Sequence, residues 1–184
     1  MIIDAELQGL DMNPENMDIP EFWNLYSAAF PETERIPEDD LRSLASVLPL
    51  TITSWYAGGT FVGMTIVYER PEVCWFWYFA VCESLRGRGY GTMILERIKS
   101  RYKDIGLILD MESPRQEADN DEQRRRRYAF YLRNGFSDTR IERTFCGVTY
   151  VILQLGGACF TPHDYDRLLG ELRSCWGSMP AESR

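Results

Sequence analysis

The feature that most constrains the fold is a glycine-rich turn between an apolar run and a helical pattern. Residues 72–81, EVCWFWYFAV, are apolar on both alternating faces, which predicts a central strand covered on both sides. Residues 86–91 then read RGRGYG, with three glycines and two arginines in six positions. Directly after them, Ile94, Leu95 and Ile98 recur at the spacing of one helical face. Glycine loses more conformational entropy on folding than any other residue, so three glycines at this junction need a reason. Their repetition indicates that a ligand approaches the backbone closely.

This turn predicts an anion-binding site. The first backbone N–H groups of a helix are unpaired and carry a partial positive charge, which suits a pyrophosphate. Arg86 and Arg88 could add charge-assisted hydrogen bonds. Two common diphosphate motifs do not fit. The Gly-Lys-Ser/Thr ending of a Walker loop is missing, and a G-x-G-x-x-G pattern counted from Gly87 has Thr92 at its sixth position.

The remaining periodic segments predict an α/β domain. Helical spacing and capping residues predict four further helices, at 18–30, 38–48, 122–135 and 161–176. Alternating or apolar runs predict further strands at 51–57, 60–70, 106–112, 139–146 and 148–155, the first two joined by a tight turn at Gly58-Gly59. This order is typical of one mixed sheet with helices on its faces.

The composition narrows the class of protein. The 184 residues fit one domain, and the net charge of −8 argues against a nucleic-acid or anionic-membrane partner and suits a cationic small molecule or basic peptide. Five scattered cysteines and a single histidine indicate neither a zinc site nor a disulfide framework, so no metal is expected. We expect a cytoplasmic protein, because the N-terminus lacks an apolar signal core and the most apolar run is about half the length of a membrane span.

A second motif lies about forty residues after the glycine-rich turn, with a strand between them. Residues 130–136 read FYLRNGF, at the end of a predicted helix. Together with the pattern Arg86-x-x-Gly89-x-Gly91 after a central strand, this motif resembles the signatures of the GCN5-related N-acetyltransferase (GNAT) superfamily, and in particular uncharacterised bacterial members. The resemblance covers roughly residues 18 to 155, although specific motifs are confined to residues 72–136.

The resemblance implies an acetyl-CoA-dependent N-acetyltransferase that needs no metal. The fold would be a single GNAT-type domain over residues 1–184, with a mixed, mostly antiparallel central sheet flanked by helices and a frayed tail at 177–184. It also implies that Tyr131 is the general acid that protonates the departing thiolate. The implied cofactor-binding residues are Phe79, Ala80 and Val81 for pantetheine and the thioester carbonyl, and Arg86, Gly87, Arg88, Gly89, Tyr90, Gly91 and Thr92 for the pyrophosphate.

The chain departs from the family pattern in two places. Members often have an asparagine seven residues before the tyrosine, where this chain has Arg124, and we expect Arg124 to contact the CoA phosphates instead. Histone-type members carry a glutamate base on the central strand, where this chain has Trp75. Glu112, at the end of the neighbouring strand, is the best-placed alternative base. Glu69, Glu72 and a chain of water molecules are further candidates for accepting the proton.

The acceptor is expected to be an amine of a small molecule or peptide. Glu34 and Arg35 lie in the turn between the first two helices, where the family usually builds its acceptor pocket, and Trp77 could form a wall of that pocket. An exposed strand edge in the final hairpin could support a homodimer.

Several other functions stay open at this stage. The fold could serve as a catalytically inactive CoA-binding regulatory or sensor module, or the glycine-rich turn could bind another nucleotide. Cys82 could carry the acyl group, although no histidine lies near it in sequence. The run Arg124 to Arg127 points to all sides of a helix and therefore does not predict a nucleic-acid groove.

Overall fold

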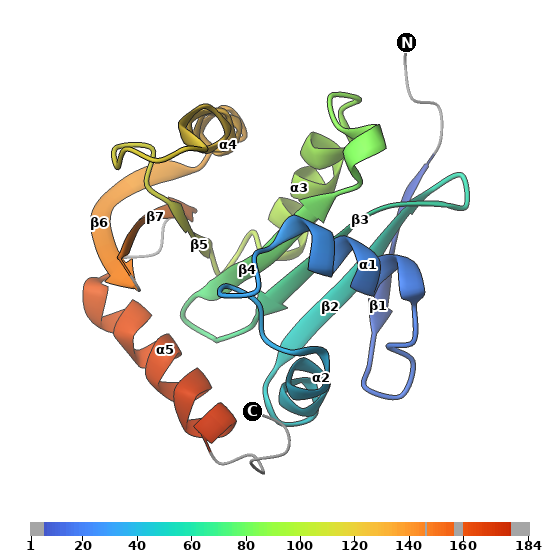
Figure 1. Ribbon diagram of the computed structural model, residues 1–184. Coiled ribbons are helices and arrows are strands. Elements are labelled where there is room, and N and C mark those ends of the chain that lie inside the picture. Colours follow the sequence, from blue (N-terminus) through green and yellow to red (C-terminus); the bar gives the residue numbers. More distant parts are fainter. Residues whose placement is uncertain (1–5, 146, 157–159, 178–184) are drawn as a thin grey trace.

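The computed structural model describes residues 6–145, 147–156 and 160–177 (Figure 1). Within these ranges the elements, in chain order, are β1 (Leu7–Met12), α1 (Pro20–Ala29), α2 (Glu38–Val47), β2 (Leu50–Ala57), β3 (Thr60–Tyr68), β4 (Cys74–Val81), a single 3-10 turn η1 (Glu83–Leu85), α3 (Tyr90–Arg101), β5 (Leu107–Glu112), α4 (Asp121–Arg133), β6 (Ser137–Phe145), β7 (Val148–Leu155) and α5 (Pro162–Gly177). The tail expected at 177–184 lies outside the described residues, apart from Gly177 at the end of α5.

The described strands form one sheet in the order β1-β2-β3-β4-β5-β7-β6. Neighbours run antiparallel except β4 and β5, which run parallel. The expected mixed, mostly antiparallel sheet is therefore confirmed. β6 lies at one edge, as the final hairpin predicted, and β1 at the other is an additional strand that the sequence did not reveal.

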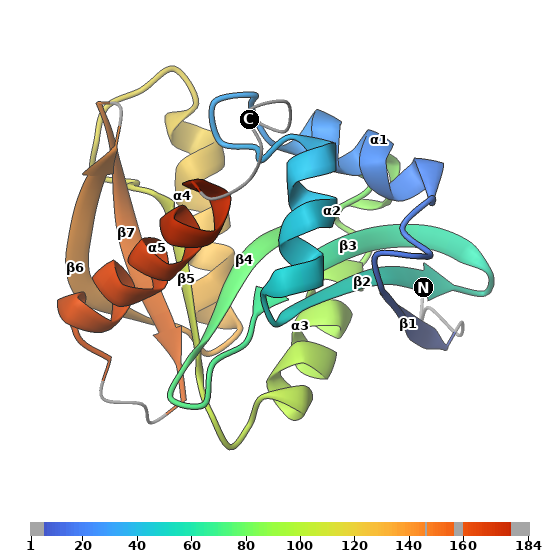
Figure 2. The ribbon, with the colours of Figure 1, turned by 90° about the horizontal axis from the view of Figure 1, so that it is seen from below.

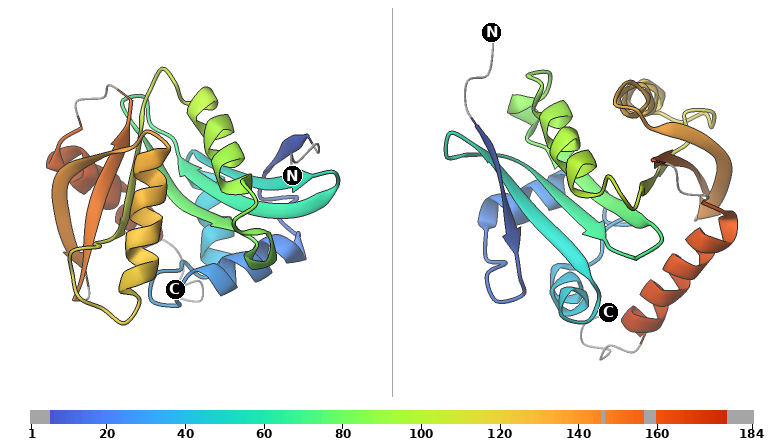
Figure 3. Two further views of the ribbon diagram at one scale, coloured as in Figure 1. Left: turned by 90° about the horizontal axis from the view of Figure 1, so that it is seen from above. Right: turned by 180° about the vertical axis from the view of Figure 1, so that it is seen from behind.

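The helices cover the sheet in two layers. α1, α2 and α5 pack on one face, and α3 and α4 pack on the other (Figures 1 and 3). β4 contributes buried side chains to both faces, with Trp75 and Tyr78 towards α1 and α5, and Cys74 and Phe76 towards α3. Since a strand between two apolar layers needs apolar residues at every position, the central placement predicted for this run is confirmed.

Two irregularities in the strand pairing of β4 shape its carboxyl end. Tyr78 pairs with Ile66 and Phe76 pairs with Val67, so Trp77 is the extra residue of a bulge against β3. The ladder between the described strands β4 and β5 has two residue pairs, Cys74–Leu107 and Trp75–Ile108. Beyond them the strands separate, as Figure 2 shows. The carboxyl half of β4 therefore has an edge towards β5 that none of the described strands pairs.

The local turn and cap chemistry agrees with the sequence. Gly58 and Gly59 have φ of 55° and 79° in the turn between β2 and β3. Thr161 and Asp164 form reciprocal hydrogen bonds at the start of α5, with Thr161 N–H donating to the Asp164 carboxylate at 2.9 Å. Across the described ranges, no helix is both long enough and apolar enough to cross a membrane.

Candidate active site

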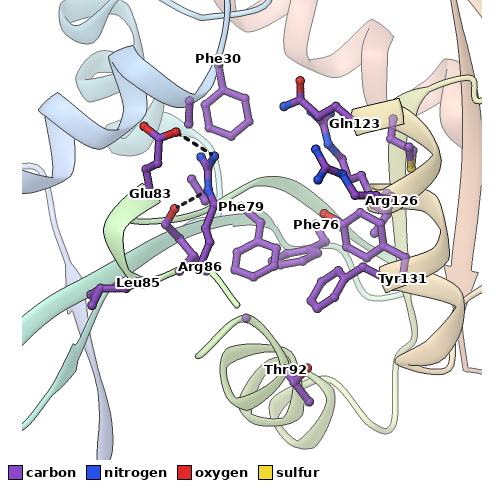
Figure 4. Close-up of a pocket in the computed structure, with 18 of the residues that line it drawn as sticks. Phe30, Phe76, Phe79, Glu83, Leu85, Arg86, Thr92, Gln123, Arg126 and Tyr131 are labelled. Carbon is purple, nitrogen blue, oxygen red and sulfur yellow. Dashed lines mark hydrogen bonds and ion pairs between the residues drawn. The ribbon is translucent and has the colours of Figure 1, made fainter. Parts of the chain in front are cut away.

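A cavity of about 960 Å³ opens where β4 and β5 separate. Its walls are the carboxyl half of β4, the glycine-rich turn with the start of α3, the middle of β5, one side of α4, and the end of α1 at Ala29 and Phe30. Figure 4 shows Phe76 and Phe79 inside this space, with Tyr131 entering from α4 and Thr92 from α3. The two sequence motifs, far apart along the chain, thus face one hollow.

Eight of the expected cofactor-binding residues line this cavity. They are Phe79, Ala80, Val81, Arg86, Gly87, Gly89, Gly91 and Thr92. Arg88, Tyr90 and Arg124 are described by the structure but do not line it. Arg86 holds its Nε 3.3 Å from the Val81 carbonyl oxygen while its side chain stays half exposed.

The glycines of the turn have a backbone conformation that other residues rarely adopt. Gly87 and Gly89 have φ of 74° and 90°, and a Cβ atom at either would meet nothing within 4 Å. The requirement for glycine is therefore conformational and leaves open space in front of the backbone. Gly89 is the N-cap of α3 and makes no side-chain cap, so the first amides of this helix have no side-chain acceptor at that position.

Tyr131 presents a protonated phenol to the cavity. Its ring is 7% exposed and packs edge-on against Phe136, with centroids 5.5 Å apart. Burial raises the pKa of its hydroxyl to about 12, although the positive charge of Arg127 acts in the opposite direction. The group therefore keeps its proton at neutral pH and can donate it.

Glu112 and Arg124 pair with each other beside the cavity. Arg124 is 5% exposed and donates from Nη2 to Glu112 Oε1 at 2.6 Å, while Arg127 Nη1 lies 3.7 Å from Oε2. Neither Glu112 nor Arg124 lines the cavity, whereas Arg126 and Arg127 of the same helix do. The role of Glu112 as a base and the contact of Arg124 with the CoA phosphates stay predictions. The ion pair weighs against both roles, because each charged group is already neutralised by the other.

Asp110 is a cavity residue that the sequence reasoning missed. Its carboxylate accepts a hydrogen bond from Trp75 Nε1 at 2.6 Å and interacts with the hydroxyl group of Tyr165. Burial raises the pKa of this carboxyl group. The signal available in the sequence was a lone acidic side chain within the otherwise apolar run LILDM.

The comparison with protein families agrees with this geometry. The model of the Acetyltransferase (GNAT) family matches residues 19–136, which is more than half of the chain. The chain belongs to the GNAT family of acetyltransferases. No protein of curated function matches the sequence significantly.

Solved structures of other GNAT proteins share the fold. A protein from Bacteroides thetaiotaomicron assigned to this family is 18% identical with a TM-score of 0.74, and the match covers 91% of this chain and 96% of that one. A GNAT acetyltransferase from Elizabethkingia anophelis, solved with acetyl-CoA bound, is 13% identical with a TM-score of 0.59 over 81% and 97% of the two chains. A Bacillus subtilis acetyltransferase in complex with CoA is 15% identical, with a TM-score of 0.58 over 82% and 98%.

Of the three expected acceptor residues, Trp77 lines the cavity, whereas Glu34 and Arg35 do not. Trp77 stacks on Trp75 with ring centroids 5.1 Å apart. The Oε1 of Glu34 accepts a hydrogen bond from Tyr150 at 2.8 Å. The Nε of Arg35 is buried and has no hydrogen-bond partner within the described residues.

The remaining candidates for an acyl carrier or a base are Cys82, Glu69 and Glu72, and each is either kept protonated or held by neighbouring side chains. Burial raises the pKa of the Cys82 thiol, which disfavours a nucleophilic thiolate. Glu69 accepts hydrogen bonds from Thr51 and Tyr102, and Glu72 pairs with Arg167 at 3.6 Å. No group of three metal-ligating side chains occurs in the part of the chain that the structure describes.

Proposed function

We propose that this protein is an N-acetyltransferase that transfers an acetyl group from acetyl-CoA to an amine by direct attack in a ternary complex. One observation carries the proposal. The glycine-lined start of α3, the unpaired edge of β4 and the protonated hydroxyl of Tyr131 all open onto one cavity. The structural neighbours solved with acetyl-CoA and with CoA support the choice of co-substrate.

The proposed binding mode follows from unpaired backbone groups. The pyrophosphate lies at the first amides of α3, where the partial charge of the helix favours an anion and Arg86 adds a cation. Pantetheine extends along Phe79–Val81, where β5 leaves backbone groups of β4 without a strand partner. Arg126 and Arg127, rather than the buried Arg124, supply positive charge at the wall formed by α4.

The chemistry needs a proton donor, a polarised carbonyl and an acceptor for the proton that the amine loses. The amine attacks the thioester carbon, a C–N bond forms and the C–S bond breaks. A backbone N–H of Phe79–Val81 stabilises the developing oxyanion, and Tyr131 gives its proton to the departing thiolate. The raised pKa of the Cys82 thiol disfavours a thiolate, which supports direct transfer over an acyl intermediate on Cys82.

Calorimetric titration with acetyl-CoA, CoA, ATP and NAD tests the co-substrate. We expect both CoA species to bind and the two nucleotides to bind at least 10-fold more weakly. Gly89→Glu should abolish CoA binding, because its carboxylate would stand at the start of α3 where the pyrophosphate belongs. The matched control is Gly147→Glu, which also has a left-handed φ (80°) and open space around a Cβ atom but lies in the β6–β7 turn. Tight ATP or NAD binding without CoA binding would overturn the proposal.

The Tyr131→Phe variant separates the enzyme from an inactive CoA-binding module. Because the phenyl ring keeps the packing against Phe136, we expect unchanged CoA affinity and a kcat lowered by about 100-fold. Release of CoA thiol with an amine acceptor is the measurement. If the wild-type protein binds CoA tightly but acetylates no amine in a broad panel, the inactive module is the better description.

A further inference from the structure

We infer that Asp110 binds the ammonium group of a cationic acceptor and then accepts its proton during acetyl transfer. This assignment rests on the proposed acetyltransferase function and names both the missing base and the charge class of the acceptor. It is carried by three observations, namely the place of Asp110 in the cavity, its lack of a counter-ion, and the groups that surround it.

The first observation is position. Asp110 lies on β5 two residues beyond Ile108, the last residue of the ladder with β4, so its side chain stands where the two strands separate. The same cavity wall continues to Trp77 and to the carboxyl end of β4, where the thioester is proposed to lie. Tyr131 lines the same cavity as Asp110. One cavity thus holds a proton acceptor and a proton donor.

The second observation is the missing counter-ion. Trp75 Nε1 and the Tyr165 hydroxyl contact the Asp110 carboxylate, but no lysine, arginine or histidine within the described ranges pairs with it. A partly buried carboxylate without a cation is costly, and such groups persist mainly where function requires them. Glu112, on the same strand, differs because two guanidinium groups already neutralise it.

The third observation is the character of the neighbouring groups. Tyr165 of α5 hydrogen-bonds to Asp110, and Glu34 of the α1–α2 loop acts on it with a second negative charge. Arg86, Arg126 and Arg127 line the same cavity from the glycine-rich turn and from α4. Arg127 pairs with Glu112 at 3.7 Å and Arg143 pairs with Asp166 at 3.3 Å, so these two arginines have acidic partners other than Asp110. Since no ion pair neutralises Asp110 and Glu34 adds negative charge nearby, a cation bound at Asp110 would be stabilised.

Aromatic rings complete a pocket for a cation. Trp77 and Phe30 line the cavity, and Trp75 stacks on Trp77 while its Nε1 holds Asp110. Aromatic faces attract ammonium groups, most strongly where water is excluded. A hydroxyl acceptor would leave the carboxylate without a counter-ion, and a carboxylate acceptor would be repelled. The pocket therefore favours an amine that arrives as an ammonium ion.

The proton balance assigns one task to each side chain. The bound ammonium loses one proton to Asp110, and the freed lone pair forms the C–N bond as the C–S bond breaks. Tyr131 protonates the thiolate, and the second proton lost by nitrogen restores the tyrosine. Asp110 then releases its proton to solvent. In sum, one ammonium ion and one acetyl thioester give one amide, one thiol and one proton.

Binding of simple cations to the CoA-saturated protein is the first test. Phenethylammonium and n-butylammonium should bind by calorimetry, and their neutral counterparts 2-phenylethanol and n-butanol should bind at least 10-fold more weakly. Asp110→Asn should weaken the cations at least 10-fold and leave CoA affinity and the alcohols unchanged. The control is Asp104→Asn, which removes the same charge from an exposed turn before β5. Equal binding of cations to the wild type and Asp110→Asn, or no binding of either cation, would overturn the inference.

Stability and pH dependence give two further readouts. Asp110→Asn removes a charge without a counter-ion, so the melting temperature at pH 7.5 should equal or exceed that of the wild type. With an acetylated amine, kcat/KM of the wild type should fall at low pH as Asp110 is protonated, whereas Asp110→Asn should be at least 100-fold slower and lack this dependence. Marked destabilisation of Asp110→Asn, or an unchanged pH profile, would show a structural role. If acetyl-CoA itself fails to bind, the proposed function fails instead.

Discussion

At the residue scale, Gly63 shows how closely β3 approaches the segment proposed to hold pantetheine. A Cβ atom at this position would lie 2.6 Å from the Ala80 carbonyl oxygen and 3.1 Å from Cδ1 of Ile94. Since backbone cannot yield as a flexible side chain can, the added methyl group must displace β4 or α3. The absence of a side chain at Gly63 therefore lets β3 lie close to Ala80, which is part of the cavity wall.

We expect Gly63→Ala to lower the free energy of unfolding by about 1–3 kcal/mol and to weaken CoA binding. Urea unfolding and calorimetry measure the two effects. Gly170→Ala is the matched control, because it adds the same methyl group to an exposed position of α5 with nothing within 4 Å, and it should stabilise the protein by about 1 kcal/mol. Unchanged stability and affinity in Gly63→Ala would mean that β4 shifts at little cost.

Also at this scale, the two acidic residues of β5 mark a limit of sequence reasoning. Asp110 and Glu112 alternate onto one face of a short strand, and the sequence favoured Glu112 because it stands at the end of the strand beside the central one. Arg124 lies 12 residues further along the chain, and its contact with Glu112 depends on how α4 packs. Neutralisation of a carboxylate by a residue on another element cannot be read from local spacing.

At the scale of elements, the Glu112–Arg124 pair joins the end of β5 to the first half of α4. Glu112→Gln leaves the buried Arg124 without its counter-ion, so the free energy of unfolding should fall by about 3 kcal/mol. The exposed pair of Glu122 and Arg126, 3.9 Å apart, offers the control, and Glu122→Gln should change stability by less than about 0.5 kcal/mol. Chemical denaturation measures both. Full stability with lost activity in Glu112→Gln would favour the catalytic role first predicted for it.

The elements themselves were largely predictable, because apolar periodicity and turn residues act locally. All five helices and six of the seven described strands lie within a few residues of the predicted ranges. β1 was missed because it is an edge strand in which four of six residues are exposed, so it has no apolar pattern. The bulge at Trp77 and the separation of β4 from β5 were not visible in the sequence, since both depend on pairing between distant segments.

At the scale of the whole molecule, the sheet consists of two parts. β1 to β4 form one, β5 to β7 form the other, and the β4–β5 ladder that joins them among the described strands has two residue pairs. The apolar cluster of α1, α2 and α5 spans both parts on one face, while the cavity interrupts their contact near the carboxyl end of β4. Homodimerisation through the β6 edge stays a prediction.

A ligand that fills the cavity should therefore strengthen the contact between the two parts. Pantetheine lying along β4 would supply partners for backbone groups that β5 does not reach, so acetyl-CoA should slow amide hydrogen exchange of residues 79–81 and of β5 more than that of β2. At 100 times its dissociation constant, acetyl-CoA should also stabilise the fold by about 2.7 kcal/mol. Hydrogen-exchange mass spectrometry with and without the ligand measures the local effect, with Gly89→Glu as the variant that should not respond. Protection confined to α3 would mean that the ligand touches the glycine-rich turn without bridging the two strands.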